Sequence, residues 1–323
     1  MKHLLAAVAL SLDVVAFSLV HAMVQAWPAK PIHAIVPVGA GSSTDIVHRL
    51  VLERLSAELG QPIVVENRTG AGGTIGTALV AKAAPDGYTV LANGSAHTIA
   101  PSLYKSLPYD AERDLLPVVA IGSSPCVLVV SPSRGIRTVA ELVMAGKARP
   151  GSLNFSSVGI GTATHLSAQR FLSSAGIEAV HVPFKGGAEA MLEVVAGRVD
   201  FFFGPVALVL PQIREGKLLP LAVNSAKRSA TLPGVPTLEQ AGIPNAEYPI
   251  WFGLFVPART PRDVVNKLNA ETMKVLRTPE LREKLSSLGV DPMAMDADQF
   301  DRYVEKEFSI NASLAHQAGL KAN

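Results

Sequence analysis

The sequence predicts an α/β fold built from two lobes that face each other across a cleft. Short apolar runs alternate with amphipathic segments along the chain, which is typical of a sheet covered by helices on both faces. This alternation occurs twice, and 323 residues suffice for about two domains that each bury a core. Hydrophobic residues make up 48% of the chain and charged residues 17%, so ample apolar surface is available for burial.

The first α/β unit is predicted near the N-terminus. Strands are expected at residues 32–37, 63–66 and 88–92. Residues 46–59 carry apolar side chains three or four positions apart, which predicts an amphipathic helix that ends at Gly60. The positions expected to be buried are Ile46, Val47, Leu50, Val51, Leu55 and Leu59. A glycine-rich segment, residues 70–76, opens a second helix that extends to Val80.

The same alternation recurs in the second half of the chain. Further strands are expected at residues 127–130, 153–157, 180–183, 199–203, 219–223 and 251–256. Helices are expected at residues 139–148, 162–174, 188–196, 264–276, 279–288 and 299–318. Ligands of such folds bind beyond the carboxyl ends of the strands, where loops lead into helix N-termini.

The first 26 residues are predicted to be a signal peptide rather than part of the fold. A short positive start precedes the mostly apolar residues 4–24, and small residues precede a cleavage site after Ala26. The alternative is an N-terminal membrane anchor, which Asp13 and His21 disfavour because ionisable side chains are costly inside a membrane. The mature protein is therefore expected to be soluble and exported.

Charge and cysteine content exclude several classes of protein. The 29 Lys and Arg residues nearly balance the 27 Asp and Glu residues, and this net charge of +2 argues against a nucleic-acid partner. Aromatic residues make up 6%, which leaves few platforms for stacking bases. The single cysteine, Cys126, excludes an intramolecular disulfide and is expected to be an inert buried thiol.

Three junctions between a strand and a helix concentrate small and hydroxyl residues, at residues 39–45, 159–165 and 184–187. The first turn of a helix offers unpaired N–H groups and a partial positive charge, so an anion can bind there. Candidate contacts are Ser43, Thr44, Thr162 and Thr164. The alternative is that these hydroxyls only cap their own helices. Three such junctions in one chain favour a shared anion site.

Signatures of enzymes are incomplete. The segment 70–76 resembles a dinucleotide-binding fingerprint, but Ile75 stands where the third glycine belongs. The segment 41–45 ends in Asp45 and so fails as a nucleophile elbow. The histidines lack the spacing of metal ligands, and no cofactor is expected. His97 and His165 adjoin the glycine- and hydroxyl-rich loops and would be the candidate catalytic groups of an enzyme.

Some residues have two open interpretations. Lys185 either pairs with an anionic ligand or lies on the surface, and Asp45 either meets a ligand or favours its own helix dipole. Residues 251–252 form either a pocket wall or part of the core. His181 lies inside a predicted strand and is expected to be packed and hydrogen-bonded.

The chain resembles the Bug-type extracytoplasmic solute receptors, which are the substrate-binding proteins of tripartite tricarboxylate transporters. The resemblance covers essentially the whole mature chain. It rests on Trp-Pro-Ala-Lys-Pro-Ile at 27–32, Gly-Ser-Ser-Thr-Asp at 41–45, Val-Glu-Asn-Arg at 65–68, Gly-Ala-Gly-Gly at 70–73, Ala-Pro-Asp-Gly-Tyr at 84–88 and Leu-Pro-Tyr-Asp at 107–110. It also rests on Gly-Thr-Ala-Thr-His-Leu at 161–166, His-Val-Pro-Phe-Lys-Gly at 181–186, Leu-Ala-Val at 221–223, Ser-Ala-Lys-Arg at 225–228 and Trp-Phe-Gly-Leu at 251–254. These motifs, in this order and spacing, are specific for the family.

The resemblance implies a type II periplasmic binding protein, with a mainly parallel sheet in each lobe and two crossovers between the lobes. Lobe 1 would comprise residues 27–124 and 249–323, and lobe 2 residues 125–248. The ligand carboxylate would lie between two loops. The implied ligand contacts are Ser42, Ser43, Thr44, Asp45, Thr162, Ala163, Thr164 and His165, with Ser95, His97, Phe184, Lys185 and Gly186 also lining the cleft.

Two departures from the family pattern bear on the ligand. Ser42 replaces the second of two glycines before Ser-Thr-Asp, which adds a hydroxyl group. The family often has an acidic or other polar residue shortly after Asp200, but here the chain reads Phe-Phe-Phe-Gly-Pro at 201–205. Gly204 cannot hold an ammonium group, so a ligand without an amino group is predicted, with Phe203 or Phe184 as apolar contacts.

The sequence therefore predicts a periplasmic receptor for a mono-, di- or aromatic carboxylate that binds by closure of its lobes. Its partners would be membrane transporter subunits, and the protein is expected to be monomeric. Two alternatives stay open. One is a secreted α/β hydrolase that uses His165 or His97, and the other is a sensor that signals to a kinase.

Overall fold

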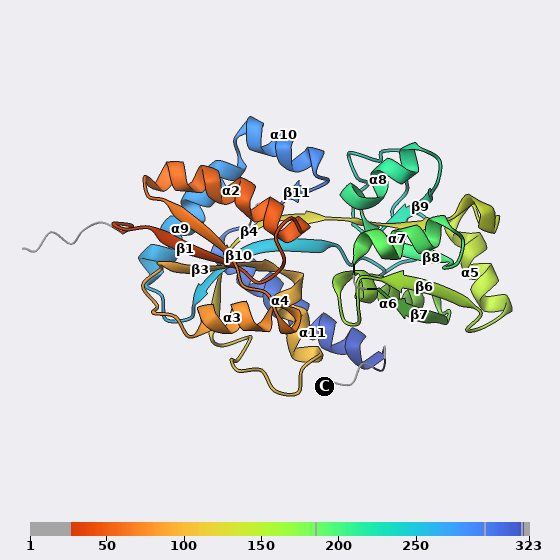
Figure 1. Ribbon diagram of the computed structural model, residues 1–323, viewed down its shortest axis with the longest axis horizontal. Helices are drawn as coiled ribbons and strands as arrows, with labels where there is room; N and C mark the ends of the chain where they lie inside the picture. Colours follow the sequence, from red (N-terminus) through yellow and green to blue (C-terminus); the bar gives the residue numbers. More distant parts are fainter. Residues whose placement is uncertain (1–26, 185, 294, 318, 320–323) are drawn as a thin grey trace, which may run out of the picture.

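Two separate sheets, one in each half of the molecule, organise the chain (Figure 1). The computed structural model describes residues 27–184, 186–293, 295–317 and 319. The predicted signal peptide lies outside these residues. Within the described part of the chain, no helix is long and apolar enough to cross a membrane. We use lobe 1 for the half that contains the first strands and lobe 2 for the other.

The sheet of lobe 1 has the order β11-β4-β10-β3-β1-β2. Its strands are β1 (Ile32–Val36), β2 (Ile63–Asn67), β3 (Thr89–Gly94), β4 (Leu115–Ser124), β10 (Ile250–Pro257) and β11 (Asp291–Pro292). Strand β1 runs parallel to β2 and β3, whereas β10 runs antiparallel to β3 and β4. The first strands and β10 thus lie in one sheet although about half the chain separates them.

The sheet of lobe 2 has the order β7-β6-β8-β5-β9. Its strands are β5 (Cys126–Val130), β6 (Leu153–Ser157), β7 (Ala179–Pro183), β8 (Phe201–Pro205) and β9 (Leu219–Val223). Strand β6 is parallel to β7 and β8, and β5 is antiparallel to β8 and β9. The strands of each sheet all come from the segments assigned to one lobe, which supports the predicted lobe boundaries at residues 124/125 and 248/249. The boundaries themselves stay a prediction.

Most strands of each sheet run in one direction, as the sequence predicts, but β10 and β11 in lobe 1 and β5 in lobe 2 run against them, so both sheets are mixed. The reason is the direction in which the chain enters each sheet from the other lobe. Strand β10 enters beside the end of β3, where Phe252 pairs with Gly94, and β5 enters beside the end of β8, where Cys126 pairs with Pro205. Each entering strand therefore runs against its neighbour, and the carboxyl ends of the parallel strands face the junction between the lobes.

Two crossovers join the lobes. In the first, Pro125 is the single residue between β4 and β5. The second leads from the end of β9 to the start of β10. The buried side chain of Asn224 connects both crossovers, because its Oδ1 accepts the Cys126 N–H at 2.7 Å and its Nδ2 donates to the Tyr248 carbonyl at 2.5 Å.

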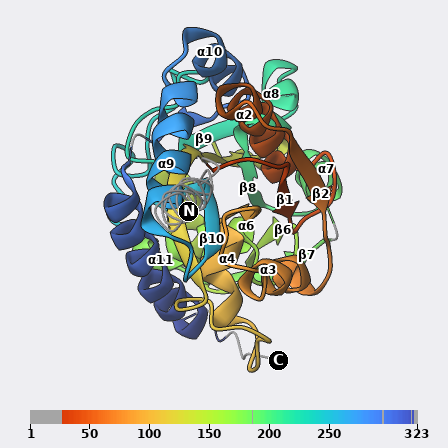
Figure 2. The same cartoon turned by 90° about the vertical axis from the view of Figure 1, so that its left-hand side faces the viewer.

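Helices cover both faces of each sheet. Their bounds are α2 (Ser43–Leu59), α3 (Thr74–Ala81), α4 (Ser95–Ile99), α5 (Val139–Ala148), α6 (Ala163–Ala175), α7 (Gly187–Val195), α8 (Val206–Arg214), α9 (Arg262–Leu276), α10 (Pro279–Ser287) and α11 (Ala297–Gln317). In lobe 1, α2 and α10 lie above the strands and α3 and α11 lie below them (Figures 1 and 2). The expected helices are present to within a few residues, but β4, α4 and α8 were not expected.

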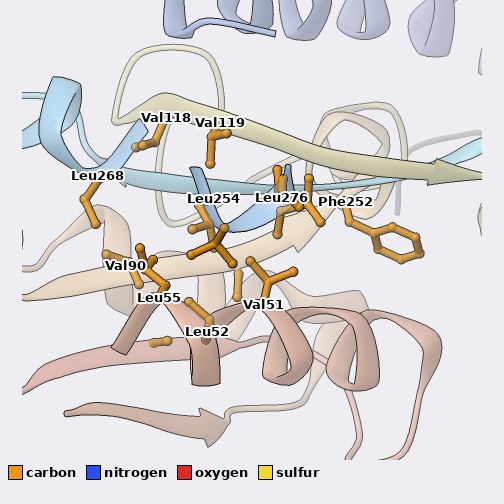
Figure 3. Close-up of a cluster of buried hydrophobic side chains, with 14 of the residues drawn as sticks. Val51, Leu52, Leu55, Val90, Val118, Val119, Phe252, Leu254, Leu268 and Leu276 are labelled. Atoms are coloured by element: carbon orange, nitrogen blue, oxygen red, sulfur yellow. The ribbon is translucent and has the colours of Figure 1, made fainter. Parts of the chain in front are cut away.

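The main core of lobe 1 lies between the sheet and helices α2 and α9 (Figure 3). Val51, Leu52 and Leu55 of α2 are buried there against Leu254 of β10. The expected buried face is wrong at Ile46, which is 44% exposed. The helix begins at Ser43, three residues before the expected start, and its buried face includes His48 instead.

The core of lobe 2 is rich in aromatic rings. Phe155, Phe171, Phe201 and Phe203 are fully buried. Phe171 of α6 meets the Phe203 ring at 5.6 Å and the Phe201 ring at 6.1 Å. These contacts hold α6 firmly on β8, so the N-terminus of α6 has a fixed position at the junction between the lobes.

Candidate functional site

A cavity of about 720 Å³ lies between the lobes, at the carboxyl ends of the parallel strands. Lobe 1 contributes lining residues within the segments 37–44, 69–73, 93–104 and 250–251, and lobe 2 within the segments 158–164, 187–188 and 205–208. Seven of the residues predicted to contact a ligand line it. They are Ser42, Ser43, Thr44, Ser95, Thr162, Ala163 and Thr164. The first two predicted junctions are thus brought together on opposite walls of one cavity.

The wall from lobe 1 is formed by the start of α2. Gly41 has φ +78°, a conformation that favours glycine, and it turns the chain from β1 into the helix. The Ser42 hydroxyl caps α2 by accepting the Asp45 N–H at 3.3 Å. Among the described residues, the N–H groups of Ser43 and Thr44 donate to no protein acceptor. These two donors are therefore free for a ligand.

Asp45 lies outside the lining and stabilises the loop. Its Oδ2 accepts the Gly41 N–H at 2.9 Å, and its Oδ1 accepts from Arg49 at 2.9 Å and Asn67 at 2.8 Å. Burial acts to raise the pKa of Asp45, but the hydrogen bonds from Gly41, Asn67 and Arg49 outweigh it and hold that pKa below its ordinary value. The carboxylate is thus already paired within lobe 1.

The wall from lobe 2 is formed by the start of α6. No side chain caps this helix, because the Thr162 hydroxyl donates to the Gly159 carbonyl at 2.8 Å instead. Within the described part of the chain, the N–H groups of Ala163 and Thr164 have no protein acceptor. Two free donors therefore lie on this wall as well, while the Thr162 and Thr164 hydroxyls bond each other and the loop.

His165 also lies outside the lining. It is 2% exposed, and its ring stacks on His181 with 3.8 Å between the ring centroids. Burial lowers the pKa of His165 to about 3, with a further contribution from His181, and burial lowers the pKa of His181 to about 4. Both imidazoles are therefore neutral at physiological pH.

Ser95 and His97 occupy the short helix α4 behind the cavity. Ser95 lines the cavity, and its Oγ accepts the Trp251 N–H at 2.9 Å. His97 does not line it but packs between Phe255 and Phe308, with ring centroids at 4.8 and 5.5 Å. Burial lowers the pKa of His97 to about 4, so it is a neutral core residue.

The third predicted junction contributes less than the sequence suggests. Phe184 packs against the apolar core of lobe 2, and Gly186 is outside the lining, whereas Gly187 and Ala188 are part of it. Lys185 lies outside the described residues. Among the described residues of this junction, no side chain lines the cavity, in contrast to the prediction.

Phe203 and Gly204 are both core residues rather than lining residues. Phe203 packs on Phe171, and a Cβ atom at Gly204 would lie 2.4 Å from Val209. The next residue, Pro205, lines the cavity instead. The lining from this strand is thus an apolar proline ring one residue after the predicted position.

Several lining residues were not predicted. The glycine-rich loop at residues 70–73 forms part of the wall, and at Gly72 an added Cβ atom would lie 2.6 Å from the Tyr104 hydroxyl. Leu103 and Leu208 add apolar surface from the two lobes. The unusual run of glycines was a usable signal for the loop, but leucine and tyrosine side chains carry no sequence signature of a binding site.

The cavity combines polar ends with apolar walls. Hydroxyl groups and free N–H groups lie at the starts of α2 and α6, while the remaining walls are largely aliphatic and aromatic. Among the described lining residues there is no Asp, Glu, Lys, Arg or His. No group of metal-ligating side chains occurs in the described part of the chain. The arrangement can bind an anion through dipoles and hydrogen bonds, in a site where burial strengthens both.

Comparison with known protein families gives a single match that covers most of the chain. Residues 47–320 match the model described as "Tripartite tricarboxylate transporter family receptor". The matched range covers lobe 2 and lobe 1 from residue 47 onward, without β1 and the start of α2.

Two related proteins match over most of their length. A UPF0065 protein from the tcbD-tcbE intergenic region of Pseudomonas sp. (strain P51) is 40% identical over 266 residues, which are 82% of this chain and 79% of that protein. Protein BugT of Bordetella pertussis is 35% identical over 297 residues, which are 91% of each chain.

Solved structures of similar proteins have the same fold. Rpa4515 of R. palustris, solved with adipate, has a TM-score of 0.81 at 32% identity and covers 92% of this chain and 100% of its own. The periplasmic binding protein BugD has a TM-score of 0.77 at 32% identity, with 92% and 100% covered. MatC of Rhodopseudomonas palustris, solved with malate, has a TM-score of 0.75 at 30% identity, with 90% and 100% covered.

Proposed function

Because this chain belongs to the tripartite tricarboxylate transporter receptor family, we propose that it captures a small organic carboxylate in the cavity between its lobes. Receptors of this kind bind and release a ligand without converting it. Closure of the lobes would exclude water, so that each hydrogen bond from a backbone N–H to the carboxylate becomes stronger. The closed form would then be recognised at the membrane.

The observation that carries this proposal is the pair of free donor sets on facing walls. Ser43 and Thr44 offer two N–H groups at the start of α2, and Ala163 and Thr164 offer two at the start of α6. Each set also benefits from the positive end of its helix dipole. A carboxylate has two oxygen atoms with about four acceptor positions, which matches the number of donors on the two walls.

The ligand proposed here is a mono-, di- or aromatic carboxylate without an amino group. An ammonium group needs an acceptor with negative charge, and the described lining holds no carboxylate side chain. Asp45 is already paired with Arg49 and Asn67. The aliphatic walls near Leu103 and Leu208 suit an apolar carbon skeleton. Structures of relatives with adipate and malate support the carboxylate class.

We further propose export to the periplasm, with removal of residues 1–26, and recognition of the closed form by membrane transporter subunits. Homologues described as periplasmic binding proteins support this location. A sensor that reports to a kinase would use the same binding step, and a pull-down of the closed form from membranes separates the two partners. The proposed oligomeric state is a monomer.

A hydrolytic function has little support from the geometry. It would need His97 or His165 beside the ligand, but neither imidazole is among the lining residues. His97 is packed between phenylalanine rings, and His165 uses its ring within lobe 2. Incubation of the protein with each carboxylate ester or amide of the ligand panel tests this alternative, because turnover would contradict a pure binding role.

The main experiment is a thermal-shift screen of about one hundred carboxylates, followed by calorimetry. A ligand at about 100 times its Kd adds about 2.7 kcal/mol of stability, which is readily seen as a rise in Tm. Ser43→Asp places a negative charge on the cavity wall and is expected to weaken binding at least about a hundredfold. Ser309→Asp, at an exposed position on α11, is the matched control and is expected to bind normally.

Three outcomes of this screen would contradict the proposal. The first is that no carboxylate raises the Tm of the wild-type protein. The second is that Ser43→Asp binds as tightly as Ser309→Asp. The third is that an amino acid binds more tightly than the carboxylate of the same skeleton without the amino group, which would overturn the ligand class alone.

A further inference from the structure

The two walls of the cavity share one local geometry that uses two different side chains. Gly41 and Gly161 both have positive φ values, +78° and +73°. The next residues, Ser42 and Thr162, have nearly identical conformations, with φ −69°, ψ 160° and φ −75°, ψ 162°. Each is the N-cap of a helix whose first turn faces the cavity. The same loop is thus built once in each lobe.

In both lobes the glycine N–H donates to the side chain four positions later. The Gly41 N–H donates to Asp45 Oδ2 at 2.9 Å, and the Gly161 N–H donates to His165 Nδ1 at 3.0 Å. A ring nitrogen accepts only when it carries no proton, so His165 must be neutral with its proton on Nε2. The Gln169 amide nitrogen lies 3.4 Å from that Nε2, and because a protonated Nε2 needs an acceptor, the amide must turn its oxygen towards the ring to bond it.

His181 holds the other end of the same loop. Its Nε2 lies 2.6 Å from the Ser157 Oγ, and this hydroxyl bonds both the N–H and the carbonyl of Gly159 at 3.0 Å. The rings of His165 and His181 are nearly parallel, at 9°, and the Phe155 ring lies beside both, with its centroid 4.8 Å from that of His181 and 5.9 Å from that of His165. The stack fixes both imidazoles, and each imidazole fixes one part of the loop.

We propose that His165, stacked on His181, is a positioning residue of the ligand site that sets the loop at residues 158–162 by accepting the Gly161 N–H. This inference rests on the proposed function, because the loop matters only if the cavity binds a ligand. Val158, Ile160, Gly161 and Thr162 line the cavity, so a shift of the loop moves the lobe 2 wall. His165 is not a lining residue itself and acts through its hydrogen bond to Gly161.

The choice of a neutral acceptor is consistent with an anionic ligand. Asp45 performs the same task in lobe 1, where Arg49 pairs with its charge at 2.9 Å. An aspartate in place of His165 would add a negative charge close to the cavity, next to the lining residue Gly161. An imidazole provides the acceptor without that charge, which avoids repulsion of a carboxylate.

The test uses His165→Asn and His165→Leu in the full mature protein. Asn keeps an acceptor two bonds from Cβ, close to the place of Nδ1, whereas Leu fills similar space without one. In the ligand-free protein, hydrogen exchange of the Gly161 N–H is expected to be at least about tenfold faster in His165→Leu and within about threefold of wild type in His165→Asn. Nitrogen chemical shifts of His165 in the wild type are expected to show the neutral form with the proton on Nε2.

Calorimetry with adipate, malate and benzoate then measures binding. For each of these probes that the wild type binds, Kd is expected to rise at least about tenfold in His165→Leu and to recover to within about threefold in His165→Asn. His181→Phe keeps the stack but loses the bond to Ser157, and an intermediate loss of affinity is expected. The far-ultraviolet spectrum and Tm of each variant show whether it is folded.

The outcomes separate this inference from the proposed function. If Gly161 exchange is unchanged in His165→Leu, or if that variant binds a probe as tightly as wild type, the positioning role is wrong while the receptor function stands. Equal loss of affinity in the Asn and Leu variants also contradicts it. If the wild type binds no carboxylate, the proposed function is wrong. The hydrogen exchange of the Gly161 N–H in the ligand-free variants then still decides whether His165 sets the loop.

Discussion

Asn224 shows how one side chain can hold two distant segments in place. It is fully buried at the end of β9 and bonds Cys126 in the first crossover and Tyr248 in the second. It also donates to the Ser167 hydroxyl on α6 at 3.0 Å. The side-chain amide therefore reinforces two backbone bonds of the same residue, from the Asn224 N–H to the Cys126 carbonyl at 3.0 Å and from the Tyr248 N–H to the Asn224 carbonyl at 2.9 Å, and adds the link to α6.

Asn224→Ala is expected to destabilise the protein by about 2–4 kcal/mol, because it leaves the Cys126 N–H and the Tyr248 carbonyl without this partner in a buried site. Urea denaturation of the variant measures the change. Ser152→Ala, which removes an exposed hydroxyl, is the control and should change the free energy of unfolding by less than about 0.5 kcal/mol. Equal stability of the two variants would show that the amide does not hold the crossovers.

Gly161 is required for two separable reasons. Its φ of +73° favours glycine, and a Cβ atom there would lie 2.2 Å from the Leu103 Cδ1 across the cavity. Gly135 has φ +72° and open space around it, so it shares only the first reason. Comparing substitutions at Gly161 and Gly135 therefore separates the effect of backbone strain from the effect of contact between the lobes.

Gly161→Ala and Gly135→Ala are each expected to cost about 1 kcal/mol of stability. Only Gly161→Ala is expected to weaken ligand binding, by about tenfold or more, because the methyl group holds the lobes apart. Calorimetry on both variants checks this. Similar affinities in the two variants would mean that Leu103 moves aside and that closure tolerates the methyl group.

At the scale of elements, α11 connects the lobes after the chain has returned to lobe 1. It covers the lower face of the lobe 1 sheet, where Phe300 packs on Trp251 with ring centroids at 5.6 Å (Figure 1). Its end reaches a small apolar cluster in which Leu314 meets Leu166 of α6 and Tyr248 of the second crossover. The helix therefore joins the lobe 1 core to the helix that carries the lobe 2 wall.

Leu314→Ala is expected to destabilise the protein by about 2–4 kcal/mol through the cavity it leaves in this cluster. Leu192→Ala removes the same atoms from a side chain that is 52% exposed, so it is the matched control and should cost less than about 1 kcal/mol. Thermal or urea denaturation compares the two. A cost at Leu314 no larger than at Leu192 would show that the end of α11 contributes little.

The elements that the sequence pattern missed have local causes. Strand β4 contains Pro117 and Gly122, which interrupt the pattern of a strand, although the sheet accommodates both. Helix α8 contains Pro211, which normally ends a helix. The first turn of α2 consists of hydroxyl and acidic residues, which suit both a turn and a helix start. In each case packing decided between two locally allowed structures.

For the site, the positions of backbone donors were more predictable than the directions of side chains. The junctions at residues 39–45 and 159–165 follow from strand and helix patterns, and both line the cavity. Neighbouring residues of a helix or strand point in different directions. Whether the side chain of Asp45, His165 or Phe203 faces the ligand therefore depends on a shift by one position, and a single sequence does not define that shift. The apolar walls, such as Leu103, come from segments without any regular pattern.

The whole molecule buries several neutral histidines, which makes its stability depend on pH. The pKa of His97 and of His181 lies at about 4 and that of His165 at about 3, and burial also lowers the pKa of His48. In the unfolded chain these groups titrate near the ordinary value of 6.5. Between these values the unfolded state binds more protons than the folded state, so protons favour unfolding.

The free energy of unfolding is therefore expected to fall as the pH drops from about 6.5 towards about 4, and these groups should have no effect above about pH 7.5. Urea midpoints measured across this range check the direction. His97→Gln removes one of the titrating groups and should give a shallower fall than wild type. A flat profile for the wild type would mean that these imidazoles are accessible to protons in the folded state.

The single residue between β4 and β5 has a consequence for how ligands are selected. The ring of Pro125 fixes one backbone angle and its nitrogen offers no hydrogen, so the joint allows rotation but almost no sliding. Trp251, in the strand that returns to lobe 1, pairs with Ser123, two residues before Pro125, and also lines the cavity. A rotation of the lobes about this joint would displace the lining beside Trp251 less than lining far from it, so a molecule that does not fit there would be rejected before the lobes close.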